Sequence, residues 1–162
     1  MVNAMDKEKK QEFTVRISNA NRSELVVILY DMILTYIEDA KGFLKNQDNQ
    51  GFCEEIMKAQ ECVKELISAL DKQYEIASDL ARLYLYVNRT FAKIMVKPEE
   101  ELITSAQNVI KGLKESFEQI AKQDNSPALM GNAQEIYAGL TYGKNSLNEN
   151  LSDEGASRGF FV

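Results

Sequence analysis

The strongest constraint on this sequence is an almost unbroken helical spacing of its apolar residues. Through most of residues 22–123, apolar side chains recur every three or four positions, as on one face of an α-helix. The sequence contains two prolines, Pro98 and Pro127, and each could occupy the first position of a helix, with Ser126 as the better of the two caps. No alternating pattern in this region is long enough to favour a sheet. The sequence therefore predicts an all-α fold.

Four long helices are expected, over residues 22–46, 52–70, 74–96 and 98–122. The first has a capping sequence, because Asn21 precedes it and Glu24 follows three residues later. Short connections require consecutive helices to run antiparallel. We expect an antiparallel up-and-down four-helix bundle over residues 22–123, an N-terminal arm over 1–21, and a C-terminal extension with an extra helix and a tail over 124–162.

The two flanking segments are less regular than the bundle. In the arm, Phe13, Val15 and Ile17 alternate with polar residues, which predicts an extended segment that either plugs a groove or packs in the core. In the extension, residues 126–147 could form a weaker fifth helix, whose glycines reduce helix stability. Residues 152–162 form a polar tail with Phe-Phe-Val at its end, either mobile or docked.

Composition argues against several classes of function. The net charge is −6, and no cluster of Lys and Arg is long enough to follow a phosphate backbone, which disfavours nucleic-acid binding. There is neither an apolar run of about 18 residues for membrane insertion nor an apolar signal segment, so we expect a cytoplasmic protein. On one helix, Cys53 and Cys62 would lie about 13.5 Å apart on opposite faces, which excludes a disulfide between them.

The commonest catalytic residue is missing, although carboxylates remain as possible catalysts. The sequence has no histidine, which removes the commonest general base and the commonest transition-metal ligand. It has no glycine-rich phosphate-binding loop. Glu99, Glu100 and Glu101 would occupy a first helical turn, where the helix dipole favours acidic side chains. We expect neither an enzyme nor a bound cofactor or metal.

The predicted helix over residues 74–96 carries more apolar residues than one core stripe requires. The core stripe consists of Leu80, Tyr84, Val87, Phe91 and Met95. A second set adds Leu83, Leu85, Tyr86 and Ile94. Since a bundle helix buries a stripe of somewhat over 100°, the second set meets either another part of this chain or a partner protein. We place a candidate partner-binding groove on Leu83, Tyr84, Tyr86 and Ile94, with Met57 and Gln60 as neighbours.

Several short motifs follow one another at characteristic spacing. They are Asn21-Arg22-Ser23-Glu24-Leu25, Leu29-Tyr30-Asp31, Lys58-Ala59-Gln60, Tyr74-Glu75-Ile76-Ala77, and Leu83-Tyr84 followed by Tyr86 and Asn88-Arg89. Through these motifs, residues 13–123 resemble the FliS family of flagellar export chaperones. The departures include Arg22, where the family has a capping proline, and Leu85, where it usually has an aspartate.

The resemblance implies a cytosolic chaperone that binds the disordered C-terminal region of flagellin, prevents premature polymerisation and assists delivery to the flagellar export apparatus. Tyr30, Asp31, Asn88 and Arg89 match the family pattern and could serve either the client or the fold, with an ion pair between Asp31 and Arg89 as one expectation. The Phe-Phe-Val of the tail could occupy the client groove until flagellin displaces it. Alternatively, the bundle is an adaptor or regulatory binding module for a different client protein.

Overall fold

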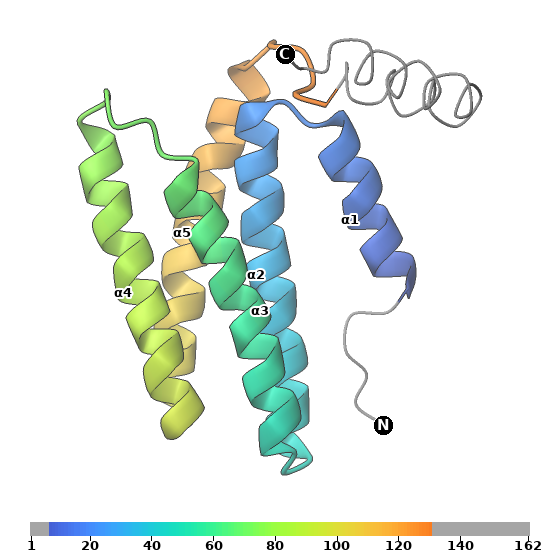
Figure 1. Cartoon of the computed structure of the whole chain (residues 1–162), viewed down its shortest axis with the longest axis vertical. Coiled ribbons are helices and arrows are strands. Elements are labelled where there is room, and N and C mark those ends of the chain that lie inside the picture. The colour runs from blue at the N-terminus through green and yellow to red at the C-terminus, as the bar shows by residue number, and fades with distance from the viewer. Residues whose placement is uncertain (1–6, 131–162) are drawn as a thin grey trace, which may run out of the picture.

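The computed structural model describes residues 7–130, and this part of the chain is all-helical, as predicted (Figure 1). Its helices are α1 (Lys7–Asn19), α2 (Arg22–Lys45), α3 (Asn49–Ser68), α4 (Ile76–Val96) and α5 (Glu100–Gln123). The four long helices, α2 to α5, begin and end within a few residues of the predicted bounds.

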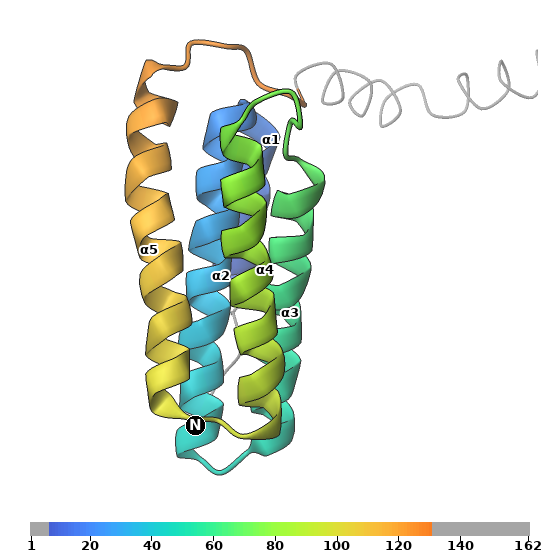
Figure 2. The same ribbon diagram turned by 90° about the vertical axis from the view of Figure 1, so that its left-hand side faces the viewer.

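Helices α2 to α5 form an up-and-down bundle. α2 packs against α3 and α5, and α4 packs against the same two helices. Figure 2 shows α4 in front, between α5 and α3, with α2 behind it. α2 and α4 therefore occupy diagonal corners of the bundle, and α1 lies outside it, where it contacts α2 and no other helix of residues 7–130.

The core lies along the bundle axis and is filled by apolar stripes from all four long helices. Its fully buried side chains include Ile33, Ile37, Ile56, Val63, Val87, Phe91 and Ile110. Burying one such side chain stabilises the fold by roughly 1.5–3 kcal/mol. α4 contributes one inner stripe to this core. The core therefore does not require the other apolar residues of that helix.

The capping box predicted at the start of α2 is confirmed. The Asn21 side chain accepts a hydrogen bond from the Glu24 N–H, and the Glu24 carboxylate accepts one from the Asn21 N–H, both at 2.9 Å. These bonds satisfy backbone donors that a helix leaves unpaired at its N-terminus. The Asn21 Nδ2 also donates to the carbonyl oxygens of Asp124 and Ser126, which ties this corner to the chain beyond α5.

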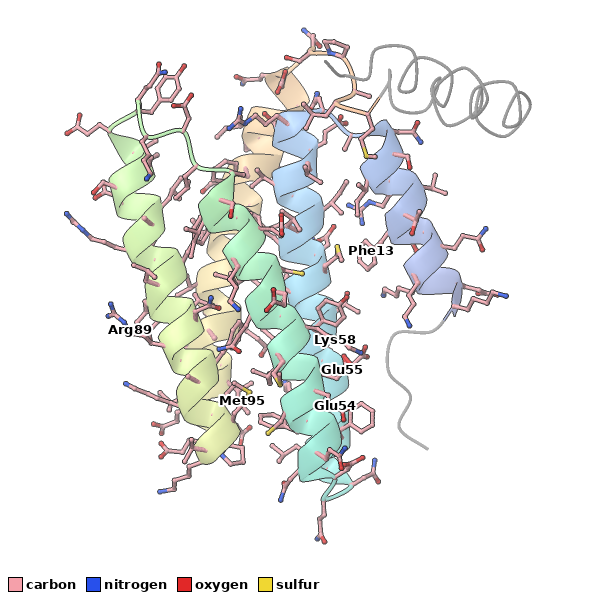
Figure 3. The ribbon with its side chains drawn as sticks, in the orientation of Figure 1. Phe13, Glu54, Glu55, Lys58, Arg89 and Met95 are labelled. Carbon is pink, nitrogen blue, oxygen red and sulfur yellow. The ribbon has the colours of Figure 1, made fainter. Side chains whose placement is uncertain are left out.

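The prediction of an extended N-terminal arm is wrong, because this segment forms α1. Phe13 points from α1 toward α2 (Figure 3) and is buried there in a small apolar cluster. Phe13, Ile17 and Ala20 are four and three residues apart, so they also form a helical stripe. The structure follows this helical spacing and not the alternation of Phe13, Val15 and Ile17. Since α1 packs on α2, diagonal to α4, the arm does not plug the predicted groove on α4.

Both predicted proline helix starts are wrong. Pro98 precedes the N-cap Glu99, so α5 begins two residues after it. Residues 124–130 are not helical, and Ser126 and Pro127 therefore begin no helix. The remainder of the predicted fifth helix, and the tail over 152–162, lie outside the described residues.

Candidate functional site

α4 carries apolar side chains on its inner face and on both of its edges. Leu83 is 39% exposed, Leu85 is 45% exposed and Tyr86 is 42% exposed. Leu83 and Tyr86 therefore lie on the surface, where the candidate groove was predicted. They extend the apolar surface of α4 beyond the stripe that the core uses.

The expectation that Tyr84 and Ile94 line an open surface groove is wrong, because their exposed fractions are 1% and 0%. The reason is helical geometry. Positions 84, 87, 91 and 94 are three or four residues apart, so they share the inner face of α4. A partner on the outer surface of α4 contacts Leu83 and Tyr86 but not Ile94.

The exposed residues of α4 belong to two different edges. The Tyr86 hydroxyl lies 2.7 Å from the Ser105 hydroxyl of α5. The carbonyl oxygen of Asn88 accepts a hydrogen bond of 3.3 Å from Gln60 of α3. Because positions 86 and 88 are about 200° apart around a helix, these two contacts lie on opposite sides of α4. The predicted groove, which joined Tyr86 to Met57 and Gln60, therefore separates into two surfaces.

We call the first surface the α5-side edge and define it by Leu83, Tyr86 and Ser105. Next to it, α5 forms a shallow hollow lined by Glu100, Glu101, Thr104, Ser105, Asn108 and Val109. The hydrogen bond from Ser105 lowers the pKa of the Tyr86 phenol. This edge combines two exposed apolar side chains with hydroxyl, amide and acidic groups.

We call the second surface the α3-side edge and define it by Met57, Gln60, Leu85 and Asn88. Met57 and Leu85 are exposed apolar side chains on the two helices that meet there. The Asn88 Oδ1 atom is buried and has no hydrogen-bond partner within residues 7–130. Buried polar atoms are normally hydrogen-bonded, so this acceptor is an exception within the described residues.

An apolar cavity of about 350 Å³ opens at the end of the bundle, where α3 connects to α4. Its apolar lining includes Val26, Leu66, Leu70, Leu80, Tyr84 and Phe117. Tyr84 is thus shielded from solvent but can be contacted by a side chain inserted here. Tyr74 and Ile76, both well exposed, also line the cavity.

Sequence reasoning missed this end of the bundle as a surface. It placed Tyr74 and Ile76 within a regular helix, whereas residues 69–75 form the connection and α4 begins at Ile76. The motif Tyr74-Glu75-Ile76-Ala77 was the one sequence feature that pointed to this surface, but the spacing of a motif does not show whether its residues are exposed.

The residues that match the family pattern have different environments. Tyr30 is fully buried, and Asn88 belongs to the α3-side edge. Asp31 of α2 pairs with Arg16 of α1 at 2.8 Å and with Lys114 of α5 at 2.6 Å. Arg89 is exposed and points away from the bundle (Figure 3).

The expected ion pair between Asp31 and Arg89 is therefore wrong. α2 and α4 stand at diagonal corners, and Arg89 lies on the outer face of α4 (Figure 3). Asp31 instead connects α2 to α1 and α5, so its role in the described structure is to hold helices together.

Residues 7–130 also bear on metal binding, membrane insertion and disulfide formation. Within residues 7–130, no three His, Cys, Asp or Glu side chains are grouped so as to hold a metal ion. No helix in this range is both long and apolar enough to cross a membrane. Cys53 and Cys62, both on α3, are free thiols, and burial raises the pKa of Cys62 to about 11.

Residues 3–124 match the family described as "Flagellar protein FliS". The chain is also similar to the "Flagellar secretion chaperone FliS" of Bacillus subtilis (strain 168), with 21% identity over 108 residues, which cover 67% of this chain and 81% of the relative. The family match includes α1 to α5 and both edges of α4.

Proposed function

This chain belongs to the FliS family of flagellar secretion chaperones, and from that membership we propose that it binds the C-terminal segment of flagellin in the cytoplasm. Bound in this way, the segment is kept from premature polymerisation, and the subunit is delivered to the export apparatus. The observation that carries the proposal is that α4 fills the core with one stripe and leaves Leu83, Leu85 and Tyr86 exposed on its two edges.

The two edges are suited to a client that folds on binding. A disordered segment with apolar residues can bind as short amphipathic helices, each with its apolar face against a groove. Leu83 and Tyr86 provide one such surface beside α5, and Met57 and Leu85 provide another beside α3. A client that crosses α4 can therefore use both edges of one helix.

Polar groups next to these apolar residues can fix the orientation of the bound client. On the α3-side edge, the half-buried Gln60 side chain, which donates to the Asn88 carbonyl oxygen, can also contact the client. On the α5-side edge, Tyr86 and Ser105 offer two hydroxyl groups. Aromatic residues with a polar atom are enriched at protein interfaces, because they combine a broad apolar area with a hydrogen bond.

Release requires no nucleotide in this proposal. Ordering a disordered client offsets part of the favourable interaction free energy, so the complex can bind and still dissociate. The two free cysteines fit a reducing compartment such as the cytoplasm.

Gel filtration of the full chain with a C-terminal fragment of flagellin tests the proposal. At micromolar concentrations we expect the two to elute together, whereas a flagellin fragment that lacks the C-terminal segment should elute alone. Separate elution of the C-terminal fragment would contradict the proposal. Stable capture of a different flagellar protein in its place would favour the adaptor function.

A further inference from the structure

The cavity at the end of the bundle has room for one large apolar side chain of a partner. Its volume is about 350 Å³, and apart from Arg22, Ser23 and Asp71 its lining residues are apolar or aromatic. A cavity of roughly 150 Å³ is enough to hold a benzene ring when its lining is apolar. Pockets that shield a side chain from water in this way are where the strongest single contacts of protein interfaces occur.

The rim of this cavity exposes further apolar surface. Tyr74 is 65% exposed and Ile76 is 62% exposed, and both line the cavity. Tyr74 lies in the connection between α3 and α4, and Ile76 begins α4, at the end of the bundle where α2 begins and α5 ends (Figure 1). Exposed apolar and aromatic residues around a pocket are typical of a protein-binding surface.

The cavity lies in line with the α5-side edge. Ile76 and Leu83 are seven residues apart on α4, so they lie about 10.5 Å apart along the helix and about 20° apart around it. Phe117 of α5 lines the cavity, and Ser105 of the same helix belongs to the α5-side edge. A client segment that lies between α4 and α5 therefore reaches the cavity at one end.

Arg22 places a positive charge at the opening of the cavity. Its exposed side chain donates a hydrogen bond of 2.7 Å from Nη2 to the carbonyl oxygen of Ala69. None of the ion pairs formed within residues 7–130 includes Arg22. Asp71 also lines the cavity, but its carboxylate accepts a hydrogen bond from the Gln73 N–H. The Arg22 guanidinium therefore has N–H groups left for a carboxylate of a partner.

We propose that this cavity anchors one large apolar side chain of the client, and that an acidic residue next to that side chain pairs with Arg22. The proposal rests on the flagellin binding proposed above and adds to it a fixed point for one end of the bound segment. The two contacts together set the register of the client on α4. A shift of the client by one residue removes the apolar side chain from the cavity and the carboxylate from Arg22 at the same time.

The affinity of the full chain for the C-terminal fragment of flagellin tests the charge. Arg22→Gln should weaken binding by about three- to fivefold at low salt, and the loss should shrink as salt is added. Lys10→Gln removes the same charge from an exposed position on α1, which does not contact α4 or α5, and should bind like the unmodified chain. An Arg22→Gln variant that binds like the unmodified chain would overturn the proposal.

Asp71→Asn tests the sign of the charge that the client brings to the cavity. Because this change removes a negative charge near the bound carboxylate, it should tighten binding by up to about twofold. Weaker binding by Asp71→Asn would show that the client brings a cation to this site, and that result would also overturn the proposal.

A filled cavity tests the anchor. Ala77 is buried in the lining, and Ala77→Leu adds a branched side chain to the cavity while keeping a good helix former in α4. We expect the affinity for the fragment to fall at least about tenfold, with a urea midpoint that stays the same or rises. An Ala77→Leu variant that is as stable as the unmodified chain and binds as tightly would contradict the anchor.

Replacing the acidic residues of the flagellin fragment one at a time by their amides identifies the partner of Arg22. One replacement should weaken binding to the unmodified chain and have no further effect on Arg22→Gln. If every replacement acts equally on both proteins, Arg22 pairs with no client carboxylate, and this proposal fails while flagellin binding stands. If the fragment does not bind the unmodified chain at all, flagellin binding itself fails, and this proposal fails with it.

Discussion

The hydroxyl oxygens of Tyr30 and Tyr84 lie 2.5 Å apart inside the bundle and connect the diagonal helices α2 and α4. Burial raises the pKa of both phenols, so both remain protonated. Phe117 of α5 packs edge-on against the Tyr30 ring, with 5.7 Å between the ring centroids. The polar atoms of two buried tyrosines are thus satisfied by each other, within an otherwise apolar layer.

Removing one of these hydroxyls should leave the other buried without its partner, so the effects of the two removals on stability should not be additive. Tyr84→Phe leaves the Tyr30 hydroxyl buried without its partner, at a cost of about 1–3 kcal/mol in unfolding free energy. The double variant Tyr30→Phe/Tyr84→Phe should lose less than the sum of the two single losses. Urea unfolding of the four proteins measures this coupling, and strictly additive losses would show that the two hydroxyls do not depend on each other.

Charges on the edges of α4 should weaken client binding without unfolding the bundle. Leu83→Asp and Leu85→Asp each place a carboxylate on an exposed apolar position, so we expect the affinity for the flagellin fragment to fall by roughly tenfold or more. Each variant should change the unfolding free energy by less than about 0.5 kcal/mol. Fluorescence titration measures the affinity, and thermal unfolding measures the stability.

Gln11→Asp is the control for these two variants. It adds the same charge at an exposed position on α1, which does not contact α4. Its affinity should equal that of the unmodified chain. If all three variants bind with equal affinity, neither edge of α4 binds the client.

Asp31 and Arg89 should differ in their effect on stability. Asp31→Asn removes the carboxylate that Arg16 and Lys114 share, so we expect a loss of about 1 kcal/mol and weaker protection of α1 against hydrogen exchange. Arg89→Ala should change the unfolding free energy by less than about 0.5 kcal/mol, because its side chain is exposed. A larger loss for Arg89→Ala than for Asp31→Asn would contradict the observed pairing.

Asp124 should make the corner between α5 and α2 sensitive to acid. Hydrogen bonds from Ser126 and Ser23 lower its pKa from 3.8 to about 2. Since the folded pKa lies below the unfolded value, its contribution to stability is present above pH 3.8 and is lost as the pH falls toward 2.

An Asp124→Asn variant isolates this contribution from the other carboxylates. The difference in urea midpoint between the variant and the unmodified chain should be constant from pH 7 to about pH 5 and should shrink below about pH 4. A difference that stays constant down to pH 2 would show that Asp124 is not stabilised in its charged form.

The bundle could be predicted from the sequence because the patterns that specify its helices lie within short stretches of the chain. Positions such as 84, 87 and 91 repeat at helical spacing, and the Asn21 and Glu24 pair specifies a helix start within four residues. α1 was missed because Phe13, Val15 and Ile17 fit an alternating pattern as well as Phe13, Ile17 and Ala20 fit a helix. Packing on α2 decides between the two, and that contact joins residues that are distant in sequence.

The surface was harder to predict because it depends on which helices are neighbours. Both Ile94 and Leu83 are apolar residues of one helix, but the positions of α3 and α5 decide which of them is buried. The same limit applies to Asp31 and Arg89, whose motifs suggest a pair that does not form because Arg89 points outward from α4. Residue type and spacing alone do not contain this information.

Methyl-detected NMR of the full chain, titrated with the C-terminal fragment of flagellin, tests most directly whether the edges of α4 bind the client. The methyl resonances of Leu83 and Leu85 should shift in a saturable way, while that of the core residue Ile37 should remain nearly unchanged. Saturable binding that leaves both leucines unperturbed and shifts methyl groups elsewhere would contradict the assignment of the client to α4.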